Sequence, residues 1–489
     1  MSETPVSAGA GGQFSLAEST RKHARYAAYV FWVMFSINFF NYFDRYILPA
    51  ALGPISDDIG LSFAGAGLLA SAFLLVYALC ALPLGYWADR GIRKNVIAIG
   101  VGLWSIATFL TGLATSVPAM FLARSAVGVG EAGYYPAGTS LLSDYFPSAK
   151  RAQILSRWTA GSFIGLALGF IAGGVIAGLS AHSWRYAFFI AGVPGLLFTF
   201  LAYRLREPRR GHADGWTGDG TATDPMNAES DPAADAHKVP LGQAFRELLS
   251  IRTIVVTILI QIFGFWVLGA AANWLPIFLH LRFGATTGQA GIIAGAVLVF
   301  AGGLGAILGG WVADLFTRRW ISGRVIVGSL GFLVGAPFMV LTLLSANFTP
   351  TPNLLVFIPF FFITGMLLNV YNGPLSAISQ DVVRPELRAM SVAISLLLAH
   401  LLGDATAPFQ IGLIINSLTG HALFDLLNQS AKGLEGLDPH GTNTALAMLI
   451  TMPAMLALAG LVGLIGSRVV GKDLKSIEAV RQERVQVAA

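Results

Sequence analysis

The chain has 489 residues, of which 55% are hydrophobic and 12% are charged, and its formal net charge at pH 7 is +5. A soluble globular domain carries roughly 25% charged residues, whereas the mean hydropathy of this chain is +0.67. The composition therefore excludes an ordinary soluble enzyme or binding domain and indicates an integral membrane protein.

Apolar stretches recur along the whole sequence. About 20 consecutive apolar residues are enough for a helix to cross a bilayer. The pattern predicts an all-α membrane protein with twelve transmembrane helices. The predicted spans cover residues 28–51, 64–86, 95–115, 118–142, 152–178, 184–204, 253–280, 288–313, 323–345, 354–379, 389–417 and 443–468.

The positions of lysine and arginine predict the orientation in the membrane. Of the 31 Lys and Arg residues, 26 lie before the first span, in the even-numbered loops and at their edges, or after the last span. Three lie in the odd-numbered loops and at their edges, and 2, Arg45 and Arg124, lie deep inside spans. Cationic loops favour the cytoplasmic side. We therefore expect a multi-pass protein of the cell (inner) membrane with both termini in the cytoplasm. Because a nucleic-acid-binding surface would not alternate from loop to loop, no nucleic-acid partner is expected.

The first span carries ionisable residues in a stretch that should otherwise be apolar. Asp44 and Arg45 are adjacent in FSINFFNYFDRYILPAAL, and a charged side chain in hydrocarbon costs at least ~2.5–3.5 kcal/mol. Asn38, Asn41 and Arg45 share one face of a helix, whereas Asp44 lies about 100° around it. One helix can thus present an acid to one neighbour and a cation to a central cavity.

The turn after span two reappears after span eight, and the end of span four reappears at the end of span ten. GYWADRGIRK and GWVADLFTRR are offset by 225 residues, and SDYFPSAKRAQ and QDVVRPELRAM are offset by 237 residues. The chain is therefore predicted to be two parallel six-span repeats with the substrate site between them. The matched pairs are Gly85 and Gly310, Asp89 and Asp314, Arg93 and Arg318, Asp144 and Asp381, and Arg151 and Arg388.

The fourth span contains a second acid with an arginine. Arg124 and Glu131 lie seven residues apart in FLARSAVGVGEAGYYPAG, on one predicted helix face with Tyr135. Burial disfavours a charged carboxylate and a nearby arginine favours it, and this opposition allows the acid to bind and release a proton. We predict that Asp44 and Glu131 couple protons. A permanent ion pair between spans one and four is the alternative.

The two repeats define the predicted domains. These are a cytoplasmic tail at 1–27, a six-helix bundle at 28–206, a second six-helix bundle at 253–470 and a cytoplasmic tail at 471–489. Residues 207–252 are rich in Gly, Asp, Ala and Pro and have no apolar period. They are predicted to form a flexible cytoplasmic linker.

Arg45 is the first candidate for binding an anionic headgroup, because a guanidinium binds phosphate or carboxylate through two parallel hydrogen bonds. In the second half, Pro276 is expected to break span seven near Asn273 and Trp274, which favours a gate or cavity there. The full set of predicted substrate-binding residues is Arg45, Arg124, Asn41, Tyr135, Asn273, Trp274, Asn372, His400 and Asp404.

Span eleven carries the ionisable cluster of the second half. His400 and Asp404 are four residues apart and share one helix face. Three roles remain open for them: proton coupling, contact with the headgroup, or a hydrogen bond within the helix bundle.

The G-x-x-x-D-R sequence from Gly85 to Arg90, echoed after span eight, resembles the signature of the major facilitator superfamily, and the resemblance covers residues 28–470. Gly91 directly follows Arg90 here, whereas the family usually has one residue between the arginine and the glycine. The resemblance implies that these turns lock the two halves on the cytoplasmic side in the outward-facing state. The implied lock residues are Asp89, Arg90, Arg93, Asp144, Arg151, Asp314, Arg318 and Arg388.

Two segments narrow the resemblance within the superfamily. INFFNYFDRYILPAAL and RSAVGVGEA are similar to the first and fourth helices of the Spinster family, transporters of sphingosine-1-phosphate and lysophospholipids. Anion:cation symporters, which move sugar acids and other organic anions with protons, share an N-Y-x-D-R helix and an R-x-x-x-G-x-x-E helix. The YYPAG that follows here favours them. Both families stay open.

No enzyme motif accompanies these features, since the chain has no H-E-x-x-H, no G-x-S-x-G and no G-x-x-x-x-G-K-[ST]. We expect a proton-coupled secondary transporter for an amphipathic anionic lipid, with a sugar-acid symporter as the alternative. The expected partners are the lipid-like substrate, protons and the bilayer. A monomer without cofactor or metal is expected.

Overall fold

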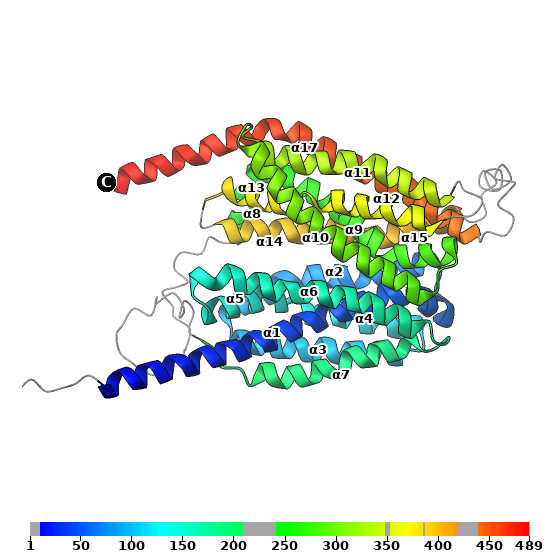
Figure 1. The fold of residues 1–489 in the computed structure, drawn as a ribbon, viewed down its shortest axis with the longest axis horizontal. Coiled ribbons are helices and arrows are strands. Elements are labelled where there is room, and N and C mark those ends of the chain that lie inside the picture. Colours follow the sequence, from blue (N-terminus) through cyan, green and yellow to red (C-terminus); the bar gives the residue numbers. More distant parts are fainter. Residues whose placement is uncertain (1–9, 209–240, 348–352, 385–386, 419–438, 489) are drawn as a thin grey trace, which may run out of the picture.

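The computed structural model describes residues 10–208, 241–347, 353–384, 387–418 and 439–488. Helices make up almost all of these residues, and no strand occurs among them. The helices cross the molecule twelve times, and some crossings consist of two consecutive helices (Figure 1).

The first six crossings form one bundle, which lies in the lower part of Figure 1. Its helices are α1 (Ala10–Ile59), α2 (Phe63–Arg90), α3 (Arg93–Leu113), α4 (Val117–Ala132), α5 (Tyr134–Tyr145), α6 (Ser148–Ala177) and α7 (Trp184–Tyr203).

The last six crossings form the second bundle, and a short helix precedes them. The elements are α8 (Leu241–Ser250), α9 (Arg252–Phe283), α10 (Thr287–Thr317), α11 (Gly323–Asn347), α12 (Leu354–Asn369), α13 (Asn372–Asp381), α14 (Arg388–Ala399), the π-helical turn η4 (His400–Asp404), α15 (Ala407–Leu418) and α17 (Pro439–Ala488). Helix α8 lies within the segment 207–252 that was predicted to be a linker, and residues 209–240 lie outside the described residues.

The beginning of α1 and the end of α17 project from the same end of the molecule, here called the terminus side (Figure 1). The opposite end, where α15 ends and α17 begins, is called the loop side. Both terminal helices extend well beyond the predicted spans, and each has 50 residues.

Ten helical segments among the described residues are long and apolar enough to cross a membrane. Helix α1 is not among them, because Asn38, Asn41, Asp44 and Arg45 lower the hydropathy of its central part. Helix α4 has only 16 residues. Both of these crossings carry buried charged residues, Asp44 on α1 and Arg124 and Glu131 on α4.

Span four is not one continuous helix, contrary to the sequence prediction. Helix α4 ends at Ala132, and α5 starts after Gly133. Pro136 has no N–H to donate back to the carbonyl of Ala132, and glycine favours the break. The same break occurs between α12 and α13, where Pro374 follows three residues after the N-cap Tyr371.

The expected break at Pro276 is wrong, because α9 runs without interruption from Arg252 to Phe283. Helices inside a bundle tolerate proline when neighbouring groups satisfy the freed backbone atoms. Span eleven is interrupted instead. Ala405 donates its N–H to His400 O at 3.0 Å, a π-type bond, and Pro408 follows in the first turn of α15.

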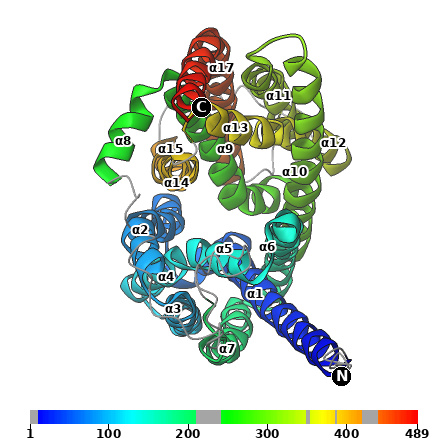
Figure 2. The ribbon, with the colours of Figure 1, turned by 90° about the vertical axis from the view of Figure 1, so that its left-hand side faces the viewer.

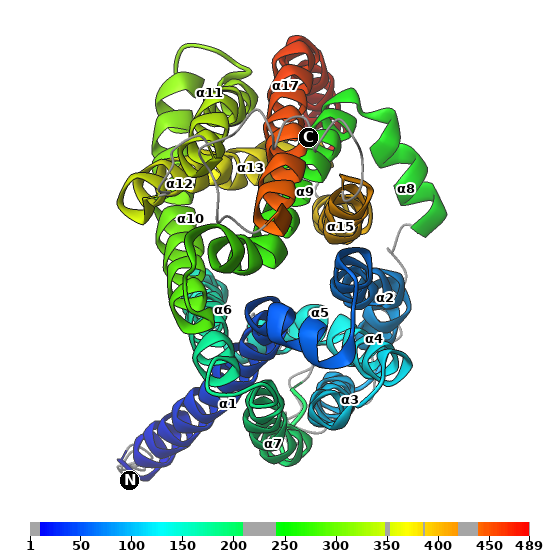
Figure 3. The ribbon, with the colours of Figure 1, turned by 90° about the vertical axis from the view of Figure 1, so that its right-hand side faces the viewer.

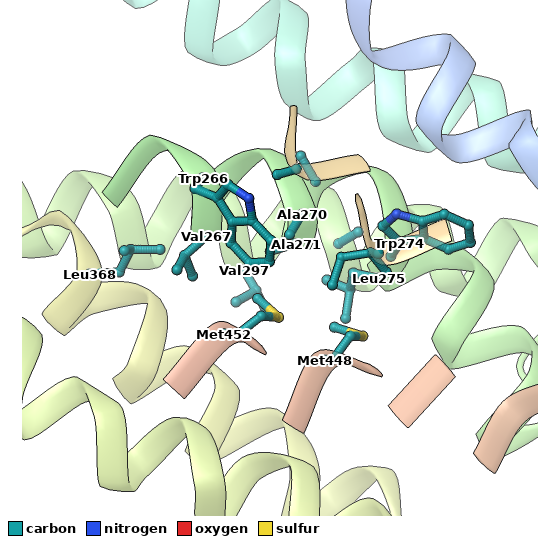
Figure 4. Packing of buried hydrophobic residues seen from close by; sticks show 14 of the residues in the cluster. Trp266, Val267, Ala270, Ala271, Trp274, Leu275, Val297, Leu368, Met448 and Met452 are labelled. Atoms are coloured by element: carbon teal, nitrogen blue, oxygen red, sulfur yellow. The ribbon is translucent and has the colours of Figure 1, made fainter. Parts of the chain in front are cut away.

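The core of the second bundle lies around α9. Leu275 of this helix lies on the side of Met448 and Met452 of α17 (Figure 4). On another side of the helix, Trp266 and Trp274 donate to Gln410 Oε1 and Pro408 O of α15. This central position leaves most of α9 buried, in keeping with its apolar sequence.

Glycines bring helices of the first bundle into close contact. A Cβ at Gly169 of α6 would lie 2.5 Å from Phe43 O of α1, and a Cβ at Gly165, one turn away, would lie 2.2 Å from Phe39 O. The small residues spaced by four in this span therefore allow α1 and α6 to touch along their backbones.

The contacts between the two bundles described here lie toward the loop side. Gly67 of α2 packs on the Pro408 carbonyl of α15, and Gly412 of α15 packs on the Phe63 carbonyl of α2, so that neither position has room for a Cβ. Helices α6 and α10 form a second such contact, with Gly291 on the Phe170 carbonyl. Seen from the terminus side, α2 lies opposite α14 and α15, and α6 lies opposite α10 (Figure 2).

Candidate functional site

An ion pair inside the first bundle joins α1 to α4. Arg45 Nη2 lies 2.6 Å from Glu131 Oε2, and Arg45 Nε donates to the same oxygen at 3.2 Å. The Glu131 side chain is fully buried, whereas 14% of the Arg45 side chain is exposed. Arg45 can therefore contact a ligand while it still holds the acid.

A second ion pair joins the same two helices. Arg124 Nη1 lies 3.3 Å from Asp44 Oδ1, and both side chains are buried. Thr108 of α3 donates its hydroxyl to Asp44 Oδ2. As the helical geometry of Asp44 and Arg45 predicted, the two neighbours on α1 serve different partners. Thr108 was missed, because a hydroxyl in an apolar span gives no signal in the sequence.

A phenyl ring of α2 lies close to both arginines. The Phe73 ring centroid lies 5.1 Å from Arg45 Cζ and 5.3 Å from Arg124 Cζ, within the range of cation–π attraction. Tyr42 and Tyr77 also place their rings 5.1 Å and 5.0 Å from Arg45 Cζ. The sequence analysis did not single out these aromatic residues.

Helix α4 approaches α2 closely at this place. A Cβ at Gly128 would lie 2.6 Å from the carbonyl oxygen of Phe73, so this position requires a glycine. Gly128 lies between Arg124 and Glu131 on the same helix face, and it therefore sets the distance between the aromatic rings and both ion pairs.

The two ion pairs leave buried polar atoms without a partner in the described part of the chain. These atoms are Glu131 Oε1, Arg124 Nε and Nη2, and Asn41 Nδ2. A purely structural network normally satisfies its buried polar groups. The arrangement therefore retains capacity for a proton, a water molecule or a ligand group.

Asn38, predicted on the helix face of Arg45, and the predicted binding residue Tyr135 have other surroundings. Asn38 donates to Trp158 O at 2.8 Å and to Ser162 Oγ at 2.7 Å, so it joins α1 to α6. Tyr135 lies beyond the break after α4, is 42% exposed, and places its ring 5.1 Å from the Trp158 ring. The shared face with Glu131 assumed a continuous helix, and for Tyr135 that assumption is wrong.

Candidate residues of the second bundle divide into two groups. Asn273 and Trp274 are buried. Asn273 Nδ2 donates to Gly269 O at 2.9 Å within α9, and Trp274 Nε1 donates to Pro408 O at 3.0 Å. Asn372 is exposed at the start of α13, and its amide donates to Asn369 Oδ1 at 2.9 Å. None of these contacts reaches the ion pairs of the first bundle.

The second group is the pair on η4. His400 Nδ1 lies 2.9 Å from Asp404 Oδ2 and 3.2 Å from Oδ1, so the predicted contact is present. The His400 ring centroid lies 5.9 Å from that of Tyr77 in the first bundle and 5.0 Å from that of Phe265 in α9. Tyr77 therefore lies between this pair and Arg45.

Arg93 is the best-connected residue of the predicted cytoplasmic lock. Its guanidinium is buried and pairs with Asp144 at the end of α5. It also donates to Glu207 Oε1 at 2.6 Å and to Pro208 O at 2.9 Å, beyond α7. These contacts all lie within the first bundle. Glu207 was missed, since one acid at the end of a span resembles an ordinary loop residue.

The second bundle has an equivalent ion pair with a different arginine from the one matched in the sequence. Asp381 pairs with Arg324 at the start of α11, whereas Arg318 is exposed. The offset of 225 residues matched Arg93 to Arg318, but α11 starts later relative to the shared motif than α3 does, so that Arg324 reaches the acid.

The other lock residues are peripheral or lie outside the described side chains. Arg151 donates to Ser143 O at 2.8 Å, and Arg90 stacks on the Tyr86 ring, 4.3 Å from its centroid. Asp314 is exposed. The side chains of Asp89 and Arg388 are not among those described.

Comparison with known proteins identifies relatives that match most of the chain. The sequence model of the Major Facilitator Superfamily matches residues 34–408. Protein spinster of Drosophila melanogaster is 29% identical over 399 residues, which are 80% of this chain and 62% of that protein. The chain thus spans less than two thirds of the Drosophila protein. The sphingosine-1-phosphate transporter SPNS2 of Mus musculus is 29% identical over 413 residues, 81% of this chain and 69% of that protein.

Solved structures of a bacterial Spinster homologue also resemble this chain. A bacterial homologue of the human lysosomal transporter Spinster, in an inward-facing and unoccupied conformation, superposes with a TM-score of 0.76 at 26% identity, and the match covers 92% of this chain and 98% of that one. An inward-facing and occupied structure gives a TM-score of 0.72 at 25% identity, with 92% and 97% covered.

Proposed function

Because the chain belongs to the major facilitator superfamily, we propose that this membrane transporter moves an amphipathic lipid with an anionic headgroup by alternating access. It is a transporter and not an enzyme. We propose further that protons are coupled to the movement through Asp44 and Glu131. The coupling and the lipid substrate go beyond what family membership establishes.

The observation that carries the proposal is the Arg45–Glu131 pair. It lies deep in the first bundle, yet Arg45 is partly exposed and Glu131 Oε1 has no partner in the described part of the chain. A guanidinium with one side accessible can receive a phosphate through parallel hydrogen bonds. The buried acid beside it can compete for the same cation.

This competition links the proton to the substrate. When Glu131 is charged, it neutralises Arg45. When Glu131 takes up a proton, Arg45 keeps a positive charge in surroundings of low polarity, and an anionic headgroup then stabilises it. Protonation and headgroup binding therefore favour one another, and by linkage each raises the affinity for the other by the same factor.

Asp44 extends the coupling to the second arginine. Its carboxylate holds Arg124, and the Phe73 ring contacts both guanidinium groups. A change of charge at one pair therefore changes the electrostatic environment of the other. Arg124 is fully buried and is the weaker candidate for direct headgroup contact.

The orientation and state are also part of the proposal. We place the terminus side in the cytoplasm of the cell (inner) membrane, which the distribution of Lys and Arg supports. The contacts between the bundles described above lie on the loop side, and the inward-facing Spinster homologue superposes well. Both observations support a state that opens toward the cytoplasm, with residues 28–206 and 253–470 rocking about their interface.

Transport in proteoliposomes tests the proposal. A lysolipid and a sugar acid are offered separately, with and without a pH gradient. Saturable lysolipid transport that the gradient accelerates is the expected result. Saturable uptake of the sugar acid that lysolipid does not inhibit would instead favour an anion:cation symporter.

A further inference from the structure

The short helix α8, Leu241–Ser250, has no part in the proposed transport site. Only Ile251 separates it from Arg252, the first residue of the apolar crossing α9. Seen along the long axis of the molecule, α8 lies across the view, whereas the crossings beside it are seen end on (Figures 2 and 3). Helix α8 therefore lies on the terminus side, at the level of the membrane surface, with its axis roughly parallel to that surface.

One side of α8 packs against the second bundle, where α9 and α14 are its neighbours. Ala244 and Leu248, one helical turn apart, are completely buried and belong to the hydrophobic core. Glu247 accepts a hydrogen bond from Arg384 Nη2 at 2.5 Å, and Arg384 lies between α13 and α14. These contacts fix the rotation of α8 about its own axis.

A second side of α8 exposes apolar side chains. Phe245 is 39% exposed and Leu249 is 37% exposed, and the two also lie one turn apart. Because successive residues of an α-helix are rotated by about 100°, this pair lies about a quarter turn from the buried pair. The apolar side of the helix is thus only partly covered by protein. Gln243, Arg246 and Ser250, all exposed, form the polar side.

The exposed pair continues the surface that the second bundle presents to lipid. Leu259, two turns into α9 on the same helix face as Arg252, is 38% exposed. The hydrocarbon layer therefore begins close to the end of α8. A helix at this level with one apolar and one polar side lies in the membrane interface, with its apolar side at the boundary of the acyl chains.

The exposed part of this region is positively charged. Glu247 is paired with Arg384, whereas Arg246 and Arg252 are exposed and form no ion pair within the described part of the chain. An arginine stem can lie along the acyl boundary while its guanidinium stays at the level of the headgroups. There it can bind a phosphate through two parallel hydrogen bonds, and its charge favours anionic lipids.

We propose that α8 is an interfacial helix that inserts Phe245 and Leu249 into the membrane leaflet on the terminus side. Arg246 and Arg252 bind the phosphate groups of anionic lipids in that leaflet. These lipids belong to the bilayer and are distinct from the transported substrate. The inference goes beyond the proposed function and depends neither on the substrate nor on proton coupling.

Fluorescence quenching on the full-length transporter tests the insertion. Cys80 is replaced by serine, and Phe245→Cys or Gln243→Cys then carries a single fluorescent label. The protein is reconstituted into vesicles of phosphatidylcholine, alone or in an equal mixture with phosphatidylglycerol. A quencher attached to the acyl chains reports insertion, and iodide on both sides of the membrane reports contact with water. The acyl-chain quencher should reach the label at position 245, and iodide should reach the label at position 243 on the polar side.

The preference for anionic lipid is tested with the label at position 245. Insertion should be stronger in the vesicles that contain phosphatidylglycerol. Replacing Arg246 and Arg252 by glutamine should remove this difference, with a loss of about fivefold for each arginine in the ratio of inserted to free label. As a matched control, Arg204→Gln combined with Arg319→Gln removes the same charge from two exposed positions elsewhere on the terminus side. This control should keep the difference.

Three results would overturn the assignment. Equal access of iodide to both label positions would mean that water surrounds α8. A label at position 245 that neither quencher reaches would mean that protein covers the exposed pair. Equal insertion in both kinds of vesicle would exclude the role of anionic lipid. These comparisons use no arginine variant, so they hold even if the double variant does not fold. None of them involves transport, so a failure here would leave the proposed function unaffected.

Discussion

The two bundles descend from one repeated pattern, but they differ in what they place inside the membrane. Both keep an arginine–aspartate pair at the terminus side, Arg93 with Asp144 and Arg324 with Asp381. Both also break the crossing that ends in this aspartate, between α4 and α5 and between α12 and α13. Both bundles therefore keep the ion pair that joins two of their helices and the break within the crossing that carries the aspartate.

The interior charges follow no such symmetry. At the offset of 237 residues that relates Asp144 to Asp381, the positions of Arg124 and Glu131 are occupied by Phe361 and Leu368. Both of these are buried apolar residues. The second bundle has its acid on span eleven instead. Among the described residues, the first bundle holds two buried acid–arginine pairs at this depth, whereas the second holds the His400–Asp404 pair.

The largest effect on transport is expected from Glu131→Gln. The amide resembles the protonated acid, so lipid binding should persist and become insensitive to pH, while concentrative uptake driven by a pH gradient should stop. Asp44→Asn should also abolish the coupling without unfolding the protein. Uptake in proteoliposomes and binding across a pH series measure both properties. If both variants still concentrate lipid, the coupling does not reside in the first bundle.

The largest difference in stability is expected between the two terminus-side pairs. Arg93→Ala removes a buried guanidinium that holds two acids and a carbonyl, and breaking a buried pair costs about 3–5 kcal/mol. Arg324 is 27% exposed, and its replacement by alanine should cost only about 0–1 kcal/mol. Thermal unfolding in detergent compares the two variants. Equal losses of stability in the two variants would mean that the two arginine–aspartate pairs stabilise the protein equally.

A smaller effect on binding is expected from Arg45→Lys. Lysine keeps the charge but lacks the planar fork that engages phosphate through two bonds. Lipid affinity should fall by about tenfold, which corresponds to ~1.4 kcal/mol, with little change in melting temperature. Normal affinity in this variant would move the headgroup site to another residue, with Arg124 as the next candidate.

The smallest of these effects is expected from Phe73→Leu. Leucine fills much of the same space but removes the ring that both arginines contact, and each cation–π contact is worth about 0.5–2 kcal/mol. The pH at which uptake is half-maximal should shift, while folding is preserved. Phe332→Leu in the second bundle is the matched control, since this ring is buried against Tyr371. A shift of the same size in both variants would indicate a general packing defect.

Much of the fold could be predicted from the sequence, because membrane crossings require long apolar stretches and cationic loops. The all-α architecture of two six-helix repeats is confirmed, and so is the resemblance to Spinster proteins. The positions at which helices are interrupted were harder to predict. Pro276 was expected to interrupt α9 but lies within a continuous helix. Pro136 and Pro408, which the sequence analysis did not consider, lie beside real interruptions.

The candidate site was predictable where the side chains were charged. Spacing alone indicated that Asp44 and Arg45 face different neighbours and that His400 meets Asp404. Thr108, Phe73 and Tyr77 could not be found in this way, because a hydroxyl or an aromatic residue is common in any membrane helix. Their roles depend on which helices become neighbours. Tyr135 was misplaced for the related reason that one break rotates every residue beyond it.

The contact between α2 and α15 has a consequence for the energetics of the transport cycle. Gly67 and Gly412 each pack against a backbone carbonyl of the opposite bundle. This part of the interface therefore consists of main-chain atoms, which do not titrate. Its strength should depend on fit and dispersion and hardly on pH or salt. A proton that enters the proposed site would therefore change the balance between the two states through the ion pairs of the interior, while the free energy needed to separate the loop-side surfaces stays constant.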